Sequence, residues 1–337
     1  MSKVTVQSPA NIAFIKYWGK QPGEEYIPLN NNISMTLSHC QTITTILRDS
    51  NLTQDTVKMQ KNDIWQSVPK DTTKNKKIYE QIDRIRNMSK YTEHVHIRTR
   101  NTFPSDAGIA SSASGFSALT TALHLAFELP SLVDDKKELS RQIRLCGSAS
   151  AARSAMGGFV ELIAGADDKS SICEQIVDEN YWELVDIIAV VDAEKKKTTT
   201  SEGHDLAGSS PYFETRLKEM QPRIHGARAA ILARDLAKLG PIIEADTISM
   251  HTVMMTSAPP IYYWQVGTMA VMHAVRQWRE AGLESYFSID AGANVHIIAE
   301  KKNASELESR LKQISFVQST IYNEPCAGVH EISEHLF

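Results

Sequence analysis

The sequence has few cysteines, and their spacing excludes the usual cysteine-based sites. No CxxC pair occurs, and the four cysteines lie far apart, at Cys40, Cys146, Cys173 and Cys326. Structural zinc sites and the disulfide frameworks of small secreted proteins both need cysteines at short, regular spacing. We therefore expect four reduced, mostly buried thiols, without a disulfide or a structural zinc ion.

Long apolar runs and an excess of positive charge are also missing. The longest apolar runs, such as Ile187 to Val191, are far shorter than the ~20 residues that span a bilayer, and the first residues lack the apolar core of a signal peptide. Because 36 Lys and Arg face 40 Asp and Glu, the net charge is -4. Such a charge offers no general attraction to nucleic acid or to an anionic membrane. We expect a cytoplasmic protein that binds neither of them.

Length and pattern indicate two domains. A chain of 337 residues with 42% hydrophobic and 23% charged residues is too long for one small core. Short β-branched strands dominate the first half, the polar run 195–203 is typical of a linker, and three long helices follow it. We expect an α+β fold with an N-terminal α/β domain (1–193), closed by the strand Ile187 to Val191, and a C-terminal α+β domain (194–337).

The elements expected from periodicity and turn residues are strands at 4–7, 12–18, 33–37, 42–47, 94–97, 159–163, 187–191, 286–290, 295–300 and 316–322, and helices at 76–88, 110–129, from 136, 222–239, 241–255, 263–281 and 304–314. The prolines at 222 and 241 are taken as helix starts. The lysine-rich stretch 49–77 predicts either a mobile flap over an anionic ligand or a solvated loop. His94 and His96 share a strand face, and we favour a solvent-facing pair over a metal site because no third ligand is evident.

The segment F-P-S-D-A-G-I-A-S-S-A-S-G, residues 103–115, predicts an anion-binding loop. Gly108 allows close backbone approach, and Ser111 and Ser112 place hydroxyls at the start of a helix, where free N–H groups and the helix dipole favour a phosphate. The loop has neither the Gly-Lys-Ser/Thr ending of a Walker A motif nor the dinucleotide fingerprint. A phosphate site of another design is indicated. A tightly packed helix start that binds nothing is the alternative.

Three further segments complete an ordered set: S-P-A-N-I-A-F-I-K-Y-W-G-K (8–20), C-G-S-A-S-A-A-R-S-A-M-G-G (146–158) and D-A-G (290–292). Together with the loop, this set resembles the diphosphomevalonate decarboxylases, a branch of the GHMP kinase superfamily. The similarity runs from residue 8 to the turn P-C-A-G at 325–328. The N-I-A-x-I-K-Y-W-G-K string is specific to these decarboxylases, whereas the loop alone indicates only the superfamily.

The resemblance implies a two-domain GHMP kinase-like fold, with a phosphate-binding loop in the N-terminal α/β domain and a ferredoxin-like α+β C-terminal domain. It also implies ATP and Mg²⁺, a homodimer, and a reaction that phosphorylates the tertiary hydroxyl of mevalonate 5-diphosphate. Phosphate and carbon dioxide then leave to give isopentenyl diphosphate.

Two residues match the chemistry of this reaction. Phosphoryl transfer to a hydroxyl needs a carboxylate beside it, and the resemblance makes Asp290 the catalytic aspartate. Orienting a substrate carboxylate suits a guanidinium with two parallel N–H groups, and the resemblance gives this catalytic and substrate-binding role to Arg153. The alternatives are an Asx turn at Asp290 and a surface ion pair at Arg153.

The remaining roles also come from the resemblance. The substrate tail is assigned to Tyr17, Lys20, Ser148, Ser150 and Thr200, with Thr199 as the alternative to the last. The nucleotide is assigned to Gly108, Ala110, Ser111, Ser112 and Ala113, with Ser112 as the Mg²⁺ ligand. Asn11 is a weaker substrate contact, Trp18 is expected in the core, and Lys16 is open between a functional and a solvent-facing position.

Four residues depart from the family pattern: Asp106, Ala149, Ala293 and Ser201. Asp106 adds a negative charge to the phosphate loop. Ser201 stands where many bacterial relatives have an arginine for the diphosphate, so mevalonate 5-diphosphate, the monophosphate and mevalonate itself are all open as substrates. Because Tyr17, Lys20 and Arg153 are present, we predict the diphosphate. The rival functions are a phosphomevalonate decarboxylase, a mevalonate 3-kinase-like small-molecule kinase, and a nucleotide-binding protein without catalysis.

Overall fold

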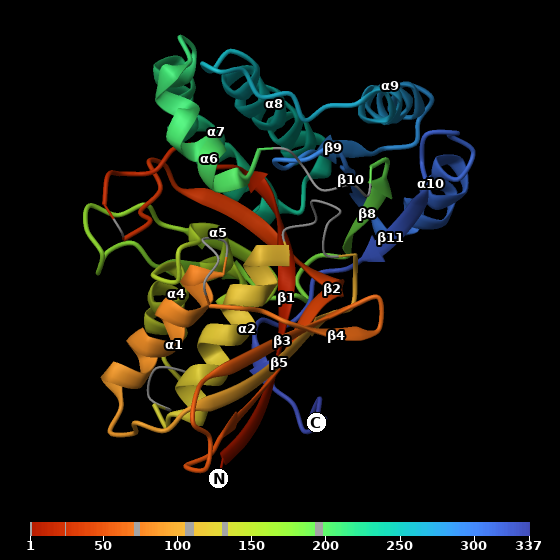
Figure 1. Ribbon diagram of the computed structural model, residues 1–337. Helices are drawn as coiled ribbons and strands as arrows, with labels where there is room; N and C mark the ends of the chain where they lie inside the picture. Colours follow the sequence, from red (N-terminus) through yellow and green to blue (C-terminus); the bar gives the residue numbers. More distant parts are fainter. Residues whose placement is uncertain (1, 24, 71–74, 105–110, 130–133, 193–197) are drawn as a thin grey trace.

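The computed structural model describes residues 2–23, 25–70, 75–104, 111–129, 134–192 and 198–337. Within these ranges the strands form two separate sheets, and helices pack on both (Figure 1). Strands dominate the start of the chain, and long helices with the second sheet follow. The predicted α+β class is confirmed.

The first sheet holds eight of the described strands, in the order β12-β1-β2-β5-β3-β4, with β6 and β7 attached to β2. The bounds are β1 (Ser2–Ile15), β2 (Asn32–Arg48), β3 (Thr56–Lys61), β4 (Ile64–Ser67), β5 (Val95–Asn101), β6 (Phe159–Leu162), β7 (Cys173–Val177) and β12 (His330–Glu331). β3 runs parallel to β5, and β1 runs antiparallel to β2. The long strands β1 and β2 form the central ribbon in Figure 1.

The four short strands predicted before residue 48 are joined into β1 and β2. Pro9 accounts for the break in the pattern, because proline has no N–H to give to a ladder. The register between β1 and β2 shifts between Pro9 and Ala10. β1 ends at Ile15, so the prediction that Lys16 to Trp18 are strand is wrong.

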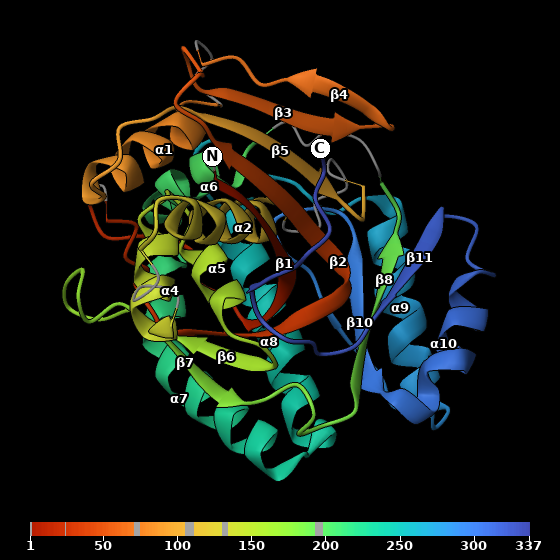
Figure 2. The same cartoon turned by 90° about the horizontal axis from the view of Figure 1, so that it is seen from below.

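Helices cover one face of the first sheet, as Figure 2 shows. They are α1 (Lys76–Met88), α2 (Ser111–Ala126), α4 (Lys136–Arg144) and α5 (Ala149–Ala152). Ile82 and Ile85 of α1 pack with Val6, Ile46 and Leu123 in one core. The bounds of α1 match those predicted from its isoleucine spacing.

Part of the lysine-rich stretch 49–77 is a β-hairpin, so the alternative of a solvated loop is wrong for residues 56–67, whereas the flap over an anionic ligand stays a prediction. β3 and β4 form an antiparallel hairpin, and β3 adds to the first sheet through β5. Alternation of apolar and polar residues in β3 is short, and the lysines obscured it. Residues 71–74 lie outside the described part.

The second sheet has the order β11-β8-β10-β9 among the described strands. Its strands are β8 (Leu184–Val190), β9 (Tyr286–Ser288), β10 (Val295–Glu300) and β11 (Ser319–Asn323). The helices α8 (Leu236–Met255), α9 (Val266–Glu280) and α10 (Ala304–Leu311) pack on it, and α7 (Phe213–Ala233) packs on α8 and on β1 and β2 of the first sheet. Ile187 and Val271 lie in a core with α9 and α10. On the other face, Ile188 and Ile231 share a core with Ile12 of β1, so both sheets contribute to one interior.

β8 is the strand expected to close the first domain, but it pairs with β10 and β11. It therefore pairs across the predicted boundary at residue 193. Its residues alternate between the two apolar cores of the second sheet, and that continuous burial is what the apolar run reflects. The division into 1–193 and 194–337 stays a prediction.

The long helices begin earlier than proline positions suggest. Pro222 lies inside α7 and Pro241 inside α8, so the prediction that they start helices is wrong. α8 begins after Asp235, whose side chain accepts a hydrogen bond from the backbone N–H of Lys238. That N-cap satisfies a free helix donor, which is a stronger start signal than a proline in the second turn.

The segment from Gly328 to Phe337 returns to the first sheet. β12 pairs with β1, and the N–H of Val329 donates to the carbonyl of Ser154 at 3.0 Å. A Cβ at Gly328 would lie 2.5 Å from the backbone carbon of Met156, so only glycine allows this close approach. Leu336 donates its N–H to Thr45 Oγ1 at 3.0 Å.

Other expectations concern thiols, histidines and membranes. All four cysteines are free, and three are buried. Burial raises the pKa of Cys146 and Cys173 to about 12.

His94 Nδ1 lies 3.3 Å from Asp55 Oδ1, and the His96 ring forms a hydrogen bond with the Thr56 hydroxyl. In the described ranges, no three His, Cys, Asp or Glu side chains form a group fit for a metal ion, and no helix is long and apolar enough to cross a membrane.

Candidate active site

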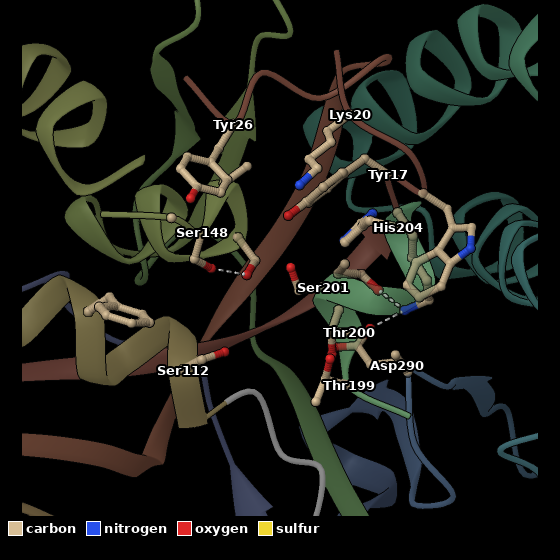
Figure 3. A pocket seen from close by; sticks show the side chains of 18 of the residues that line it. Tyr17, Lys20, Tyr26, Ser112, Ser148, Thr199, Thr200, Ser201, His204 and Asp290 are labelled. Carbon is tan, nitrogen blue, oxygen red and sulfur yellow. Dashed lines mark hydrogen bonds and ion pairs between the residues drawn. The ribbon is translucent and has the colours of Figure 1, made fainter. Parts of the chain in front are cut away.

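A cleft of about 380 Å³ lies where β1, α2, α5 and the loop after β9 meet. Its described lining includes Tyr17, Lys20, Ser112, Ser148, Thr200 and Asp290, which come from segments far apart in the chain (Figure 3). Arg153 and Asp290 line this same cleft. The carboxylate and the guanidinium singled out in the sequence are thus brought together.

Lys16 and Asp290 form the charged centre of the cleft. The Lys16 ammonium donates to Asp290 Oδ1 at 2.6 Å, to Ser288 Oγ at 2.9 Å and to the Ala13 carbonyl at 2.9 Å. Lys16 is only 2% exposed, so the solvent-facing alternative for it is wrong. The Asp290 side chain is 26% exposed, and this part faces the cleft.

Asp290 carries a negative charge at neutral pH. Burial by itself would raise the pKa of Asp290, but the Lys16 ammonium and its hydrogen bond, with His296 and Arg153, lower it below the ordinary value. The carboxylate follows β9 by two residues, and its own carbonyl accepts the N–H of Gly292 at 2.7 Å. This tight turn aims the side chain into the cleft.

Side chains from both halves of the chain fix the backbone of Lys16. Its N–H donates to Asp246 Oδ2 at 2.8 Å, and its carbonyl accepts from Arg216 at 3.0 Å and from Asn30 at 3.1 Å. Arg216 and Asp246 form a buried ion pair at 3.0 Å. Because side chains satisfy these backbone groups, β1 can end here and the chain can turn toward the cleft.

Arg153 follows α5 in a short 3₁₀ helix, Arg153–Ala155, and is 3% exposed, which rules out a surface arginine. Its Nε and Nη2 donate to Asn11 Oδ1 at 3.1 and 2.8 Å, and Nη1 donates to Asn32 Oδ1. Within the described residues, all its hydrogen bonds go to neutral amides. Burial lowers the pKa of Arg153, but a guanidinium stays protonated, so a buried positive charge faces the cleft without a bonded carboxylate.

The hydroxyl-rich segment after α4 supplies two neighbouring donors. Ser148 Oγ and Ser150 Oγ lie 3.0 Å apart, and both line the cleft. Asn11 donates to the Ser150 carbonyl at 3.2 Å and to Ser154 Oγ at 2.9 Å, which fixes the segment against β1. From the sequence, Asn11 was expected to be a weak substrate contact. In the structure, its side chain forms hydrogen bonds both to Arg153 and to this segment.

A short helix, α6 (Thr200–Leu206), closes another side of the cleft. Thr199 and Glu202 form a capping box at its start, so the polar run predicted as a linker is partly helical. His204 stacks on Tyr17 with ring centroids 4.7 Å apart, and its Nδ1 accepts the N–H of Gly19 at 3.0 Å. Burial raises the pKa of Tyr17. These contacts join α6 to the segment that follows β1.

Two more contacts complete the attachment of α6. Lys20 Nζ lies 3.1 Å from Asp205 Oδ1. Gly203 packs closely on Trp18, and a Cβ added at residue 203 would lie 2.5 Å from the indole Cζ2. Trp18 is 1% exposed and belongs to a core cluster, as predicted. Ser201 also lines the cleft.

At the opposite end, α2 begins at Ser111, and both Ser111 and Ser112 line the cleft. Ala113 is fully buried and is not among the described lining residues, so the structure gives its side chain no place in the cleft. Gly108 and Ala110 lie outside the described residues, as does Asp106.

Sequence reasoning missed Lys77, Tyr26 and His204 as lining residues. Lys77 donates to the Gly147 carbonyl at 3.1 Å, and its ammonium lies 4.8 Å from the centre of the Tyr26 ring, with that of Lys20 at 5.4 Å. Burial lowers the pKa of Lys77. The lysine-rich stretch pointed to an anion, but spacing could not separate Lys77 from its neighbours.

The fold, the helix start with its serines, and the cleft shared by Asp290 and Arg153 define a member of the GHMP kinase-like class. The sequence model of the diphosphomevalonate decarboxylase-like N-terminal domain family matches residues 8–173. That of the mevalonate 5-diphosphate decarboxylase C-terminal domain family matches residues 186–334. The chain belongs to the diphosphomevalonate decarboxylase family, so the family and fold expected from the motifs are confirmed.

Individual relatives agree. The diphosphomevalonate decarboxylase of Candida albicans is 33% identical over 98% of this chain and 95% of its own. The crystal structure of mevalonate diphosphate decarboxylase from Staphylococcus aureus has a TM-score of 0.89 at 32% identity, and covers 98% of both chains. MDDEF, solved in complex with MVAPP, AMPPCP and magnesium, has a TM-score of 0.88 at 31% identity, over 98% of this chain and 99% of its own.

Proposed function

We propose that this chain decarboxylates mevalonate 5-diphosphate in an ATP-dependent reaction that yields isopentenyl diphosphate. One observation supports this above the others: a buried guanidinium bonded to neutral amides and an ionised carboxylate face one cleft. A substrate with a carboxylate and a neighbouring hydroxyl would satisfy both groups. The names of the relatives and the ligands held by MDDEF agree with such a substrate.

Asp290 would act on the tertiary hydroxyl. The carboxylate accepts the hydrogen bond of that hydroxyl and aligns its oxygen for attack on phosphorus. Since its pKa is lowered, Asp290 is a weak base in the ground state and takes the proton as the new O–P bond forms. Lys16 keeps Asp290 ionised and directed into the cleft through its contact at 2.6 Å.

Arg153 would bind the substrate carboxylate through two parallel N–H groups. When phosphate departs with the C–O electrons, the electron pair of the bond to the carboxylate forms the new C=C bond, and carbon dioxide leaves. By holding the carboxylate in one plane, Arg153 aligns the C–C bond to the carboxylate with the C–O bond to the departing phosphate. A desolvated guanidinium suits this role, because its attraction to a carboxylate is strongest where water is excluded.

The diphosphate tail would lie between Tyr17, Lys20, Ser148, Ser150 and Thr200, which line the cleft. Lys20 pairs with Asp205, whose side chain is 61% exposed, so an incoming phosphate competes with a well-hydrated and therefore weak partner. Lys77 lines the same region, and we propose it as the lysine of the 49–77 stretch that contacts a phosphate.

ATP supplies the transferred phosphoryl group when it is bound. Ser111 and Ser112 stand at the start of α2, where the hydroxyls and the positive end of the helix dipole favour phosphate oxygens. Mg²⁺ usually keeps several waters and binds few protein oxygens together with phosphates, so a single hydroxyl such as that of Ser112 fits this chemistry. The proposed nucleotide contacts also include Gly108 and Ala110, and Ala113 only through its backbone, since its side chain is fully buried.

The second candidate function is decarboxylation of the monophosphate. Ser201 in the cleft supports it, because a neutral hydroxyl at that position asks for less negative charge than an arginine would. Turnover of mevalonate, its 5-phosphate and its 5-diphosphate with ATP and Mg²⁺ tests both candidates. The expected result is preferred use of the diphosphate with release of carbon dioxide; ADP formed without carbon dioxide would instead identify a small-molecule kinase.

We also propose a cytoplasmic homodimer, as the family resemblance implies. Light scattering coupled to size exclusion would give a mass near twice that of the 37.6 kDa chain. A single-chain mass at micromolar concentration would reject the dimer.

A further inference from the structure

Three buried side chains, two of which line the cleft, form a small cluster of their own. Arg153 is 3% exposed, Asn11 of β1 is 1% exposed and Asn32 at the start of β2 is fully buried. The Arg153 Nε and Nη2 donate to Asn11, whereas Nη1 donates to Asn32. The two asparagines therefore hold opposite sides of one guanidinium from neighbouring strands.

A count of donors shows what this arrangement leaves available. A guanidinium has five N–H groups in a rigid plane, one on Nε and two on each Nη. The bonds to Asn11 use one on Nε and one on Nη2, and the bond to Asn32 uses one on Nη1. Among the described residues, no partner takes the second N–H of Nη1 or of Nη2, and a guanidinium uses two such N–H groups to bind a carboxylate.

We propose that Asn32 is a positioning residue for the substrate carboxylate, acting through Arg153. Asn11 holds one edge of the guanidinium through two hydrogen bonds to a single oxygen atom, and without a second acceptor the guanidinium can pivot about that atom. Asn32 adds the second contact and fixes the plane. This inference rests on the proposed function of Arg153 and extends it to a residue to which the sequence motifs gave no role.

The choice of an amide matters as much as its place. Asn32 accepts a hydrogen bond without neutralising the charge of Arg153, so the positive charge is kept for the ligand. An aspartate of the same shape would form an ion pair and compete with the substrate carboxylate. Asn32→Ala removes the contact, and Asn32→Asp keeps the contact but adds the charge.

Steady-state kinetics with mevalonate 5-diphosphate and ATP test the positioning role of Asn32. Losing one hydrogen bond to a charged group predicts a fall in kcat/KM of about 10- to 100-fold for Asn32→Ala. Asn32→Asp is expected to lose more activity than Asn32→Ala while keeping an equal or higher unfolding temperature. Affinity for ATP alone should stay within about threefold in both variants, because the nucleotide end of the cleft is untouched.

Asn31→Ala is the matched control. Asn31 donates to Glu161 at 2.9 Å and accepts the N–H of Ala164 at 2.9 Å, so it bonds to a different element. This neighbour should retain kcat/KM within about threefold, as is usual for a site without shared partners.

A double variant separates positioning from general damage. In an Arg153→Met background, Asn32→Ala should add no further loss, because the hydrogen bond to Arg153 through which Asn32 is proposed to act is already gone. An equal loss in both backgrounds, or no loss from Asn32→Ala in the native chain, overturns the role of Asn32. Unchanged kcat/KM in Arg153→Met alone would instead reject the proposed function of Arg153, so the two failures are distinguishable.

Discussion

The ammonium of Lys16 lies 2.6 Å from Asp290 Oδ1, although 273 residues separate the two in the sequence. Lys16 belongs to the segment that leaves the first sheet, and Asp290 to the loop that leaves the second. The contact therefore depends on both halves of the chain being correctly packed. It also sets the charge state of the carboxylate, because the ammonium favours the ionised form.

Replacing Asp290 by alanine should remove most of the catalytic rate while leaving ATP affinity nearly intact. The lost group acts on the substrate hydroxyl, and general-base contributions of this kind amount to about 10²- to 10⁴-fold. Single-turnover rates with mevalonate 5-diphosphate would measure the loss, and calorimetry would measure ATP binding. Turnover equal to that of the native chain would rule out a catalytic role for Asp290.

Lys77→Met should weaken phosphate binding, raising KM for a phosphorylated ligand about tenfold for one lost charge-assisted hydrogen bond. Lys76→Met is the control, because Lys76 pairs with Glu80 on the exposed side of α1 with 69% of its side chain accessible. Titrations with ATP and with mevalonate 5-diphosphate would show which ligand Lys77 contacts. Equal effects of the two variants would show only a loss of general positive charge.

Gly203→Ala should loosen α6 from the segment after β1. The added Cβ would lie 2.5 Å from the Trp18 ring, and overpacking of this kind costs about 1–3 kcal/mol. Because α6 carries Thr200 and Ser201 into the cleft, KM for the substrate should rise as well. Gly208→Ala is the control, since a Cβ at that position would meet no other atom within 4 Å. Thermal unfolding and kinetics of the pair would decide; matching behaviour would contradict tight packing at Gly203.

Stability should fall on acidification partly because of His124. This residue is fully buried, both of its ring nitrogens are without a hydrogen-bond partner in the described part of the chain, and burial together with Arg84 lowers its pKa to about 3, against a smaller opposite effect of Glu138. The unfolded chain takes up a proton near pH 6.5 whereas the folded chain does not, so the unfolded state binds more protons between these values. The free energy of unfolding therefore falls as the pH drops from about 6.5 toward 3.

His124→Gln removes this titration. Its unfolding free energy should depend less steeply on pH, by a difference of up to about 1.4 kcal/mol per pH unit below pH 6. Urea unfolding at pH 7, 6, 5 and 4.5 would measure the slopes. Parallel curves for the native chain and the variant would contradict a neutral buried ring.

Local patterns in the sequence predicted those parts of the fold that depend on neighbours in the chain. The isoleucine spacing of α1 and the short, largely apolar run of β10 gave bounds that agree with the structure. Pro222 and Pro241 misled because tertiary packing keeps α7 and α8 continuous through them, and Asp235 provides the actual start of α8. No local signal shows that β8 pairs with β10 and β11, since pairing partners lie more than 100 residues away.

The same limit applies to the cleft. Motifs named Asp290, Arg153, Tyr17, Lys20, Ser148 and Ser150, all of which line it. Lys16, within the most specific motif, was left undecided because its partner Asp290 comes from another sheet. Lys77 and His204 stand in segments without a motif, and only the packing of α1 and α6 brings them to the cleft.

The return of residues 328–332 to β1 has a consequence for biosynthesis. Gly328 and Val329 rest against Met156 and Ser154, beside the arginine of the cleft, and β12 pairs with the sheet that the ribosome produced first. A nascent chain can assemble its early strands during translation, but this support arrives only after the entire second sheet has emerged. Maturation of the cleft is therefore coupled to synthesis of residues 328–332, and a polypeptide terminated before them would carry Asp290 and Arg153 yet lack the backing behind the guanidinium.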